Sequence, residues 1–259
     1  MKVIESRDNA LFKSFVRTST GKVRSNAWLE GVHLCQAWLE HQVTVPEFAI
    51  FDASRLEQNA ELQDIFRAVP EHAKVVLAPT LMKKLSQVQE GQGVAFIVSP
   101  PTFTLSETIN TTALWLDRVQ DPGNMGTLLR TAAAAGVSAV YCSAGCASVW
   151  SPKVLRSAQG AHFGLSIYEG CNLPDLCNRL TVPLAAMTLA GSVSLYKASL
   201  PQHVVWLAGN EGQGVLPELE ARAKLKIYIP QANSVESLNV ATATAICLFE
   251  HRRRFLAGD

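Results

Sequence analysis

The chain has 259 residues, of which 48% are hydrophobic and 17% are charged, and its formal net charge is +1. A chain of this length forms one large domain or two modest ones, and its apolar share is enough to bury a core. Because the whole molecule is nearly neutral, it is not a general polycation, and any surface that binds nucleic acid must be local.

Basic residues gather at the start of the chain. Residues 1–31 carry six basic side chains against three acidic ones, whereas residues 32–73 are acidic on balance. Phosphate-binding surfaces are built from such clusters, but exposed Lys and Arg are also the ordinary content of a solvated helix face. This cluster is the first of two candidate RNA-binding surfaces, and its members are Arg7, Lys13, Arg17, Lys22 and Arg24.

The first hundred residues alternate between short helical and strand-like segments. We expect helices at residues 9–18 and 61–68, and strands at residues 48–51, 75–78 and 94–98. An alternation of this kind over about 100 residues is typical of one small α/β domain.

A linker is expected after this part of the chain. Residues 99–112, SPPTFTLSETINTT, contain two consecutive prolines and many hydroxyl residues. Such a composition favours an irregular connection between folded units. The predicted domains are therefore residues 1–98 and residues 113–259.

Apolar strand-like runs and helical segments also alternate after the linker. The expected strands are residues 113–116, 139–142, 184–189, 204–208 and 227–229. The expected helices are residues 124–135, 153–158, 175–180 and 238–255. Buried strands separated by helices favour a mainly parallel sheet, so the fold class is α/β in both domains.

The chain shows no sign of export or membrane insertion. Its N-terminus, MKVIESRDN, lacks the apolar core of a signal peptide, and no apolar run reaches the length of a membrane span. The six cysteines form no C-x-x-C pair, and the loose spacing of Cys142 and Cys146 has no accompanying pair of histidines. We therefore expect a cytoplasmic protein with reduced thiols and no metal site.

The first of three polar motifs is residues 116–136, LDRVQDPGNMGTLLRTAAAAG. Its D-P-G-N turn starts a helix, and Asn124 is either the N-cap of that helix or a functional group. Arg130 is unusual in an alanine-rich helix whose residues one turn away are all small. It is either a snorkelling surface residue or a ligand-binding one.

The second motif is residues 207–215, LAGNEGQGV, which follow an apolar strand. Its glycines allow backbone to approach a ligand closely, or they only permit a tight loop. The order G-x-x-G-x-G is not the dinucleotide-binding order G-x-G-x-x-G, and no ribose-binding acid follows about twenty residues later. A nucleotide-cofactor fingerprint of that kind is therefore disfavoured.

The third motif is residues 227–250, IYIPQANSVESLNVATATAICLFE, in which a strand ends at Pro230 and S-L-N opens a helix of small residues. Between the first and second motifs, Lys153 and Arg156 lie three positions apart, which places both on one helix face. That face is the second candidate surface for RNA phosphates, or it is merely solvated.

In this order, the three motifs resemble those of the SpoU-type (TrmH-like) RNA 2′-O-ribose methyltransferases of the SPOUT superfamily. The resemblance implies a catalytic domain over residues 113–259 whose parallel sheet contains a trefoil knot, a rare exception to ordinary chain connections. It implies an L30e-like RNA substrate-binding domain over residues 1–98, where the match is weaker. It also implies a homodimer.

The resemblance further implies that S-adenosylmethionine binds at the backbone of the knot. The matching cofactor-binding positions are Leu189, Gly209, Asn210, Ile229 and Leu238. The matching catalytic positions are Asn124, Arg130, Glu211, Ser237 and Asn239. The sequence departs from the family pattern at Gln231, where Met is usual, and at Asn233, where Gly is usual; neither departure removes a catalytic side chain.

The residue types can be compared with this chemistry. A ribose 2′-hydroxyl is a poor nucleophile until it loses its proton, so the protein must align it with the methyl group and assist deprotonation. Arg130 matches the family's proposed base, but a guanidinium with a pKa above about 12 seldom yields a proton. The other role open to Arg130 is to bind the neighbouring phosphate and stabilise the developing alkoxide.

The leading hypothesis is an S-adenosylmethionine-dependent RNA 2′-O-ribose methyltransferase that acts on ribosomal RNA, the substrate that an L30e-like domain favours. Transfer RNA is the alternative substrate. A second hypothesis is a non-catalytic RNA-binding assembly factor on the same fold, against which the intact catalytic positions argue. A third is a SPOUT enzyme that methylates a base, against which the S-L-N motif argues.

Overall fold

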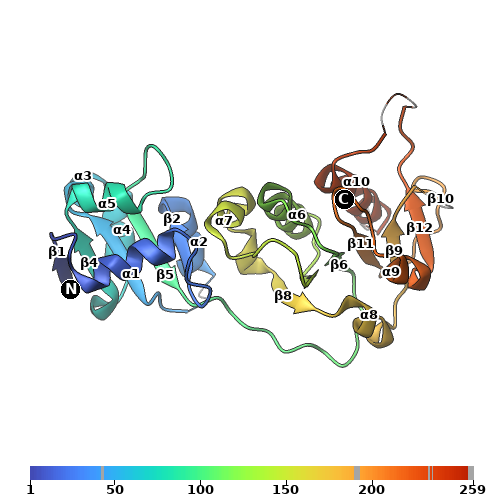
Figure 1. The fold of residues 1–259 in the computed structure, drawn as a ribbon, viewed down its shortest axis with the longest axis horizontal. Coiled ribbons are helices and arrows are strands. Elements are labelled where there is room, and N and C mark those ends of the chain that lie inside the picture. The colour runs from blue at the N-terminus through green and yellow to red at the C-terminus, as the bar shows by residue number, and fades with distance from the viewer. Residues whose placement is uncertain (42–43, 190–192, 233, 235, 256–259) are drawn as a thin grey trace. The chain divides into compact units, whose positions relative to one another are not determined.

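The chain folds into two compact units (Figure 1). The first comprises Met1–Pro101 and Trp150–Phe163, and the second comprises Thr102–Val149 and Gly164–Asp259. The structure, a computed structural model, describes residues 1–41, 44–189, 193–232, 234 and 236–255.

The first unit is built on a five-stranded mixed sheet in the order β1-β4-β3-β5-β2. β1, β4 and β3 are parallel, whereas β5 and β2 join the sheet antiparallel. The strands are β1 (Lys2–Ile4), β2 (Ala27–Glu30), β3 (Phe48–Asp52), β4 (Lys74–Leu77) and β5 (Val94–Val98). The predicted strands are present as β3, β4 and β5, and β1 and β2 lie outside the predicted set.

Helices pack on both faces of this sheet and form two core clusters. They are α1 (Ala10–Ser19), α2 (Val32–Glu40), α3 (Ala53–Gln58), α4 (Ala60–Ala68), α5 (Pro79–Leu85) and α7 (Pro152–Ala158). The two helices predicted in residues 1–98 are present as α1 and α4.

Local sequence signals account for α1. The side chain of Asn9 accepts hydrogen bonds of 2.8 and 3.3 Å from two first-turn N–H groups, which the helix itself leaves unpaired. Phe12 and Phe15 are buried one turn apart, so one face of the helix packs into the core. The opposite face carries Lys13 and Arg17, both exposed.

The segment Trp150–Phe163 packs in the first unit, although its place in the sequence suggested the second domain. α7 buries Leu155 in the core cluster that α2 and β2 also form. Phe163 meets Trp38 edge-on, with ring centroids 5.3 Å apart. The helix predicted at residues 153–158 is present, but nothing in its own pattern indicates which core its apolar face joins.

The second unit is built on a seven-stranded sheet in the order β10-β12-β9-β11-β6-β7-β8. Every ladder between its described strands is parallel, so the prediction of a mainly parallel sheet is confirmed. β8 and β10 are the two strands that the sequence did not predict. The strands are β6 (Ala113–Leu116), β7 (Ala139–Ser143), β8 (Ser166–Cys171), β9 (Leu184–Met187), β10 (Val193–Ser194), β11 (Val205–Ala208) and β12 (Leu225–Tyr228).

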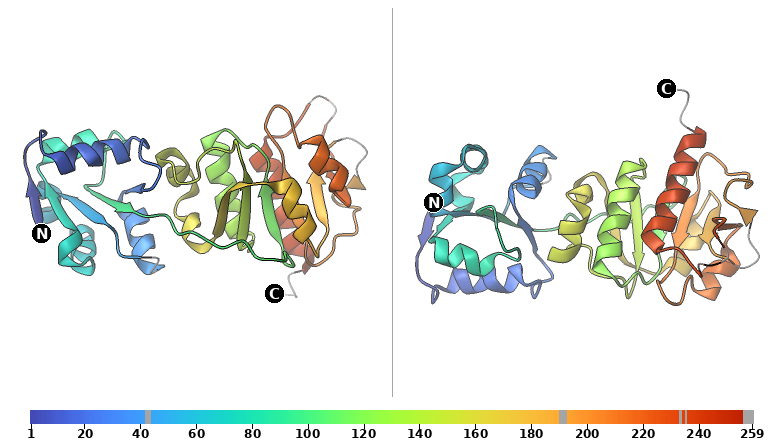
Figure 2. Two further views of the ribbon diagram at one scale, coloured as in Figure 1. Left: turned by 60° about the horizontal axis from the view of Figure 1, so that its bottom comes forward. Right: turned by 90° about the horizontal axis from the view of Figure 1, so that it is seen from above.

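Helices cover both faces of the parallel sheet. α6 and α10 lie side by side on one face (Figure 2). On this face the His251 ring of α10 meets Trp206 of β11 with ring centroids 6.0 Å apart. On the other face, α8 and α9 bury Leu173 and Leu219 in a cluster with Trp115. The four helices are α6 (Pro122–Ala134), α8 (Leu173–Leu176), α9 (Pro217–Arg222) and α10 (Val240–Phe255).

The trefoil knot stays a prediction, because the loops after β9 and β12 include residues 190–192, 233 and 235, which lie outside the described part of the chain. Among the helices that the structure describes, none is long and apolar enough to cross a membrane. The layering leaves the carboxyl ends of the strands to polar loops, where ligands of open parallel sheets bind.

Candidate active site

A cavity of about 690 Å³ opens at the carboxyl ends of β9, β11 and β12, which are neighbours in the parallel sheet. The loops that follow these three strands meet here, together with the start of α10 and one residue of α6. Its walls lie within residues 187–189, 208–215, 227–231 and 236–247, together with Asn124.

The cavity brings together most of the residues that the sequence predicted to be functional. All five predicted cofactor-binding positions line it, as do four of the five predicted catalytic positions. Of the two departures from the family pattern, Gln231 lines the cavity and Asn233 lies outside the described residues. The lining predicted residues are Leu189, Gly209, Asn210, Ile229 and Leu238, with Asn124, Glu211, Ser237 and Asn239.

The loop after β11 forms a tight hairpin at one end of the cavity. Asn210 and Gly214 pair through both backbone groups, with N–O distances of 3.0 and 2.9 Å. The Asn210 side-chain oxygen accepts the N–H groups of Gly212 at 3.0 Å and Gln213 at 2.9 Å. A Cβ on Gly209 would lie 2.2 Å from the carbonyl carbon of Gly214. Glycine is therefore required at this position by the close approach of two backbone segments.

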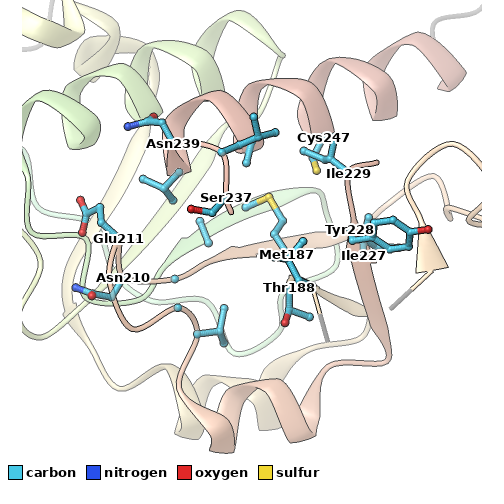
Figure 3. Close-up of a pocket in the computed structure, with 18 of the residues that line it drawn as sticks. Met187, Thr188, Asn210, Glu211, Ile227, Tyr228, Ile229, Ser237, Asn239 and Cys247 are labelled. Atoms are coloured by element: carbon cyan, nitrogen blue, oxygen red, sulfur yellow. The ribbon is translucent and has the colours of Figure 1, made fainter. Parts of the chain in front are cut away.

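A chain of hydrogen bonds joins the three motifs. Asn239 Nδ2 donates to Asn124 Oδ1 at 2.9 Å, and Asn124 Nδ2 donates to Glu211 Oε1 at 3.1 Å. Asn239 Oδ1 accepts the N–H groups of Ala241 at 2.9 Å and Thr242 at 3.2 Å, so it caps α10. This capping leaves only Nδ2 of Asn239 for Asn124 and thereby orients both amides. Figure 3 shows Asn239 and Glu211 at the same end of the cavity.

Glu211 is held as a carboxylate. Its oxygens accept the backbone N–H groups of Asp121 at 3.1 Å and Gln120 at 3.2 Å. Burial raises the pKa of Glu211, but the hydrogen bonds from Asn124 and from these backbone groups outweigh burial and leave the pKa below its ordinary value. A carboxylate stabilised in this way orients Asn124 and is a weak base.

Asn124 does not cap α6. The N-cap is Asp121, whose side chain accepts the Asn124 N–H at 2.8 Å, and Pro122 occupies the first helical position. The interpretation of Asn124 as an N-cap is therefore wrong. Its side chain is free to bond Asn239 and Glu211 instead.

The charge of the cavity favours a cationic ligand. The described residues that line it include two carboxylates, Glu211 and Glu236, and no Lys, Arg or His. Apolar side chains such as Met187 and Ile227 and the backbone of the hairpin supply other parts of the wall. The volume lies in the range of small-molecule sites, about 300–1,000 Å³.

Arg130 is the predicted catalytic residue that the structure does not bring to the cavity. It lies on α6 with an exposed side chain, six positions after Asn124 and thus on a different side of the helix. Within the described part of the chain, no hydrogen bond or ion pair engages its guanidinium. One copy of the chain therefore leaves Arg130 apart from the other catalytic candidates.

The residues predicted to bind RNA phosphates all lie in the first unit. The five in the N-terminal cluster are exposed, and one of them, Lys13, forms a 3.7 Å ion pair with Asp8. On α7, Lys153 is exposed, whereas Arg156 is partly buried and lines a second cavity of about 380 Å³. Their role in RNA binding stays a prediction.

The thiols of Cys142 and Cys146 lie next to the start of the first motif. Cys146 Sγ donates to the Leu116 carbonyl at 3.3 Å. A hydrogen bond from the Cys142 thiol lowers the pKa of Cys146 to about 7, although burial opposes this shift. All six cysteines are free thiols, and no group of three His, Cys, Asp or Glu side chains among the described residues could hold a metal ion.

Asp117 and Arg118, which directly follow β6, were not predicted to be functional, and Arg118 contacts the hairpin at the end of the cavity. The buried carboxylate of Asp117 accepts two hydrogen bonds from the Arg118 guanidinium, at 3.1 and 3.2 Å. Arg118 also donates to Gln213 of the hairpin at 2.7 Å. The signal in the sequence was an acid–base pair directly after an all-apolar strand, where a buried charge needs a partner.

The chain is similar to known proteins over nearly its full length. Residues 111–249 match the model of the SpoU rRNA Methylase family. A Synechocystis protein named as an uncharacterized tRNA/rRNA methyltransferase is 34% identical, over 99% of this chain and 95% of its own. The 23S rRNA (guanosine(2553)-2′-O)-methyltransferase RlmP of Bacillus subtilis is 32% identical, over 97% of this chain and 100% of its own.

A solved structure gives the same result for the fold. The AdoMet-bound rRNA methyltransferase from Sinorhizobium meliloti is 28% identical to this chain and superimposes with a TM-score of 0.86, covering 99% of each chain. The family model spans more than half of the sequence, and its match covers the first two motifs and all but the last residue of the third. The chain therefore belongs to the SpoU rRNA methylase family.

Proposed function

We propose that this protein transfers a methyl group from S-adenosylmethionine to a ribose 2′-hydroxyl of ribosomal RNA. The observation that carries the proposal is the line of hydrogen bonds from Asn239 through Asn124 to Glu211 beside the acidic cavity. Further support comes from the activity for which the B. subtilis relative is named and from the AdoMet bound to the S. meliloti protein. Transfer RNA is the second substrate class, because the Synechocystis relative is named for both RNAs.

The cavity fits S-adenosylmethionine in volume, in wall composition and in charge. The backbone at Gly209, Asn210 and Ile229 would hold the cofactor, with Leu189 and Leu238 as apolar contacts. The bound cofactor supplies a methyl group that its sulfonium charge has already activated. Carboxylates near the cavity favour a ligand of that charge.

On the RNA side, the 2′-oxygen accepts the methyl group, its proton passes to solvent water, and S-adenosylhomocysteine leaves, so the protein must orient the 2′-hydroxyl and stabilise the loss of its proton. Asn124, fixed between Asn239 and Glu211, would orient the ribose, and Ser237 adds a hydroxyl to the same wall. Arg130 would bind the phosphate beside the target ribose and stabilise the alkoxide. A guanidinium group seldom yields a proton in proteins, which argues against the role of base.

The active form in this proposal is a homodimer. Arg130 lies outside the cavity of its own chain, so a second copy of the chain would supply an arginine to the site. α10, which packs against α6, also presents the apolar side chain of Phe249, which is 46% exposed. Such a side chain suits an interface between two copies.

The first unit would provide RNA affinity in the cytoplasm, where ribosomal RNA is met. Its exposed basic cluster in residues 1–31 supports this part of the proposal. Phosphate contacts of this kind fix a protein on RNA without reading its sequence. Residues 1–98 resemble an L30e-like RNA substrate-binding domain, and we propose the same role for this unit.

A transfer assay tests the proposal. The purified protein is incubated with labelled S-adenosylmethionine and either 23S ribosomal RNA or transfer RNA, and the product is digested to nucleosides for mass spectrometry. We expect a methyl group on the ribose of one ribosomal RNA nucleotide. A methyl group on a base would show a different SPOUT reaction, and cofactor binding without transfer to either RNA would favour the non-catalytic assembly factor.

A further inference from the structure

The acid–base pair after β6 is more extensively bonded than an ion pair that only stabilises the fold. Asp117 is 0% exposed, and its carboxylate accepts the Leu216 N–H at 2.9 Å as well as the Arg118 guanidinium. The guanidinium also bonds to the hairpin: it donates to Gln213 Oε1 at 2.7 Å and to the Gly214 carbonyl at 3.3 Å. The pair thus contacts the hairpin at its tip and at its base.

The backbone of Arg118 is held in an unusual conformation. Its φ is 55°, in the left-handed region that a residue with a long side chain rarely adopts. The Arg118 N–H donates to Ser143 Oγ at 2.9 Å, and its carbonyl accepts Asn210 Nδ2 at 2.8 Å. Backbone strain of this kind persists where the surroundings fix it, and such places are often functional sites.

Two of the bonded partners of Arg118 line the cavity. Gly214 and Asn210 both line it, and they pair with each other to close the hairpin that Gly209 enters. Glu211, in the same hairpin, accepts the backbone N–H groups of Gln120 and Asp121. The hairpin is therefore fixed at two places to the segment that connects β6 to α6.

We propose that Asp117 and Arg118 are positioning residues that keep the hairpin after β11 in the form that binds the cofactor. They act through Asn210, Gln213 and Gly214 and do not line the cavity themselves. This inference rests on the proposed function, because it assigns positioning residues to the same cofactor site. A merely structural ion pair would affect folding stability and leave cofactor affinity of the folded protein unchanged.

The variant Arg118→Lys separates these two roles. Lysine keeps the positive charge beside Asp117, but a single ammonium cannot reproduce the planar fork that bonds Asp117, Gln213 and Gly214 together. Arg222→Lys is the matched control, since Arg222 also bonds a carboxylate and a carbonyl, Glu218 at 3.2 Å and Pro174 at 3.1 Å, away from the cavity.

Two measurements on the full-length protein give the result. Without cofactor, hydrogen exchange of the hairpin amides should be at least about tenfold faster in Arg118→Lys than in the wild type, because the hairpin opens more often. With cofactor, KM for S-adenosylmethionine should rise about tenfold, the effect of losing roughly one charged hydrogen bond, while kcat at saturating cofactor stays within about twofold. Arg222→Lys should match the wild type in both.

The opposite results overturn the inference. Unchanged exchange in the hairpin, or a lower kcat and melting temperature with unchanged KM, would mean that the pair is only structural. If Arg118→Lys does not fold, the double variant Asp117→Asn/Arg118→Asn removes both charges, and Asn tolerates the left-handed conformation; the same two outcomes apply to it. A wild-type protein that binds no cofactor would refute the proposed function. The exchange experiment needs no cofactor, so it tests only whether Asp117 and Arg118 hold the hairpin.

Discussion

Replacing Gly209 with alanine perturbs the cofactor cavity at one defined place. The added Cβ would lie 2.2 Å from the Gly214 carbonyl carbon, 2.6 Å from the Gly214 oxygen and 2.3 Å from the Val215 nitrogen. All three are backbone atoms, so no side-chain rotation can relieve the clash. Because carbon atoms in contact stay about 3.5 Å apart, the hairpin must move by roughly 1 Å.

The size of the effect follows from that movement. Displacing the hairpin strains the backbone pair between Asn210 and Gly214 and changes the wall of the cavity. Overpacking of this kind costs about 1–3 kcal/mol. If the cost falls on the bound state, affinity for the cofactor drops roughly 5- to 150-fold.

Isothermal titration with S-adenosylhomocysteine measures this loss directly. Gly212→Ala is the matched control on the same hairpin, since a Cβ there would meet only Asn210 Oδ1, at an ordinary 3.7 Å. We expect Gly209→Ala to bind weakly and Gly212→Ala to bind like the wild type. Equal affinities for all three proteins would refute the role of the hairpin as a cofactor wall.

Other changes test the remaining parts of the site. Arg130→Ala should lose at least about 100-fold in methyl transfer while it keeps cofactor affinity, because its partners are RNA and the transition state; near-normal turnover in a single-turnover assay would remove Arg130 from the site. Alkylation of Cys146 followed by mass spectrometry should increase with pH with a midpoint of about 7, whereas Cys247, whose pKa burial raises to about 12, should stay unreactive. Neutralising the N-terminal cluster should reduce the salt dependence of RNA affinity in filter binding and leave cofactor affinity unchanged; an unchanged slope would place the RNA surface near α7. The residues to neutralise together are Arg7, Lys13, Arg17, Lys22 and Arg24.

Local sequence signals predicted most of the second unit. The apolar runs that became β6, β7, β9, β11 and β12 are long enough to be recognised as buried strands, and their separation by helices implied the parallel sheet. β10 has only two residues, and β8 is mostly polar or exposed at its centre, so neither shows the usual pattern. The motifs located the cavity because loops at the carboxyl ends of neighbouring parallel strands converge.

Tertiary contacts explain what the sequence did not show. The bonds of Arg118 to Gln213 and Gly214 join residues almost a hundred positions apart, which no local pattern reveals. The packing of Leu155 in the first unit depends on which core has room for it, not on the helix that carries it. The first motif predicts that both Asn124 and Arg130 are catalytic, but α6 places them on different sides of the helix.

Mapping ribose methylation in cells that lack this gene tests the central claim most directly. Ribosomal and transfer RNA from these cells and from the parent strain would be compared for 2′-O-methyl groups at every nucleotide. We predict that one ribosomal RNA position loses its methyl group, and that the wild-type gene restores it while the Arg130→Ala gene does not. Identical methylation maps with and without the gene, in both classes of RNA, would contradict the assignment of this protein as a ribose methyltransferase.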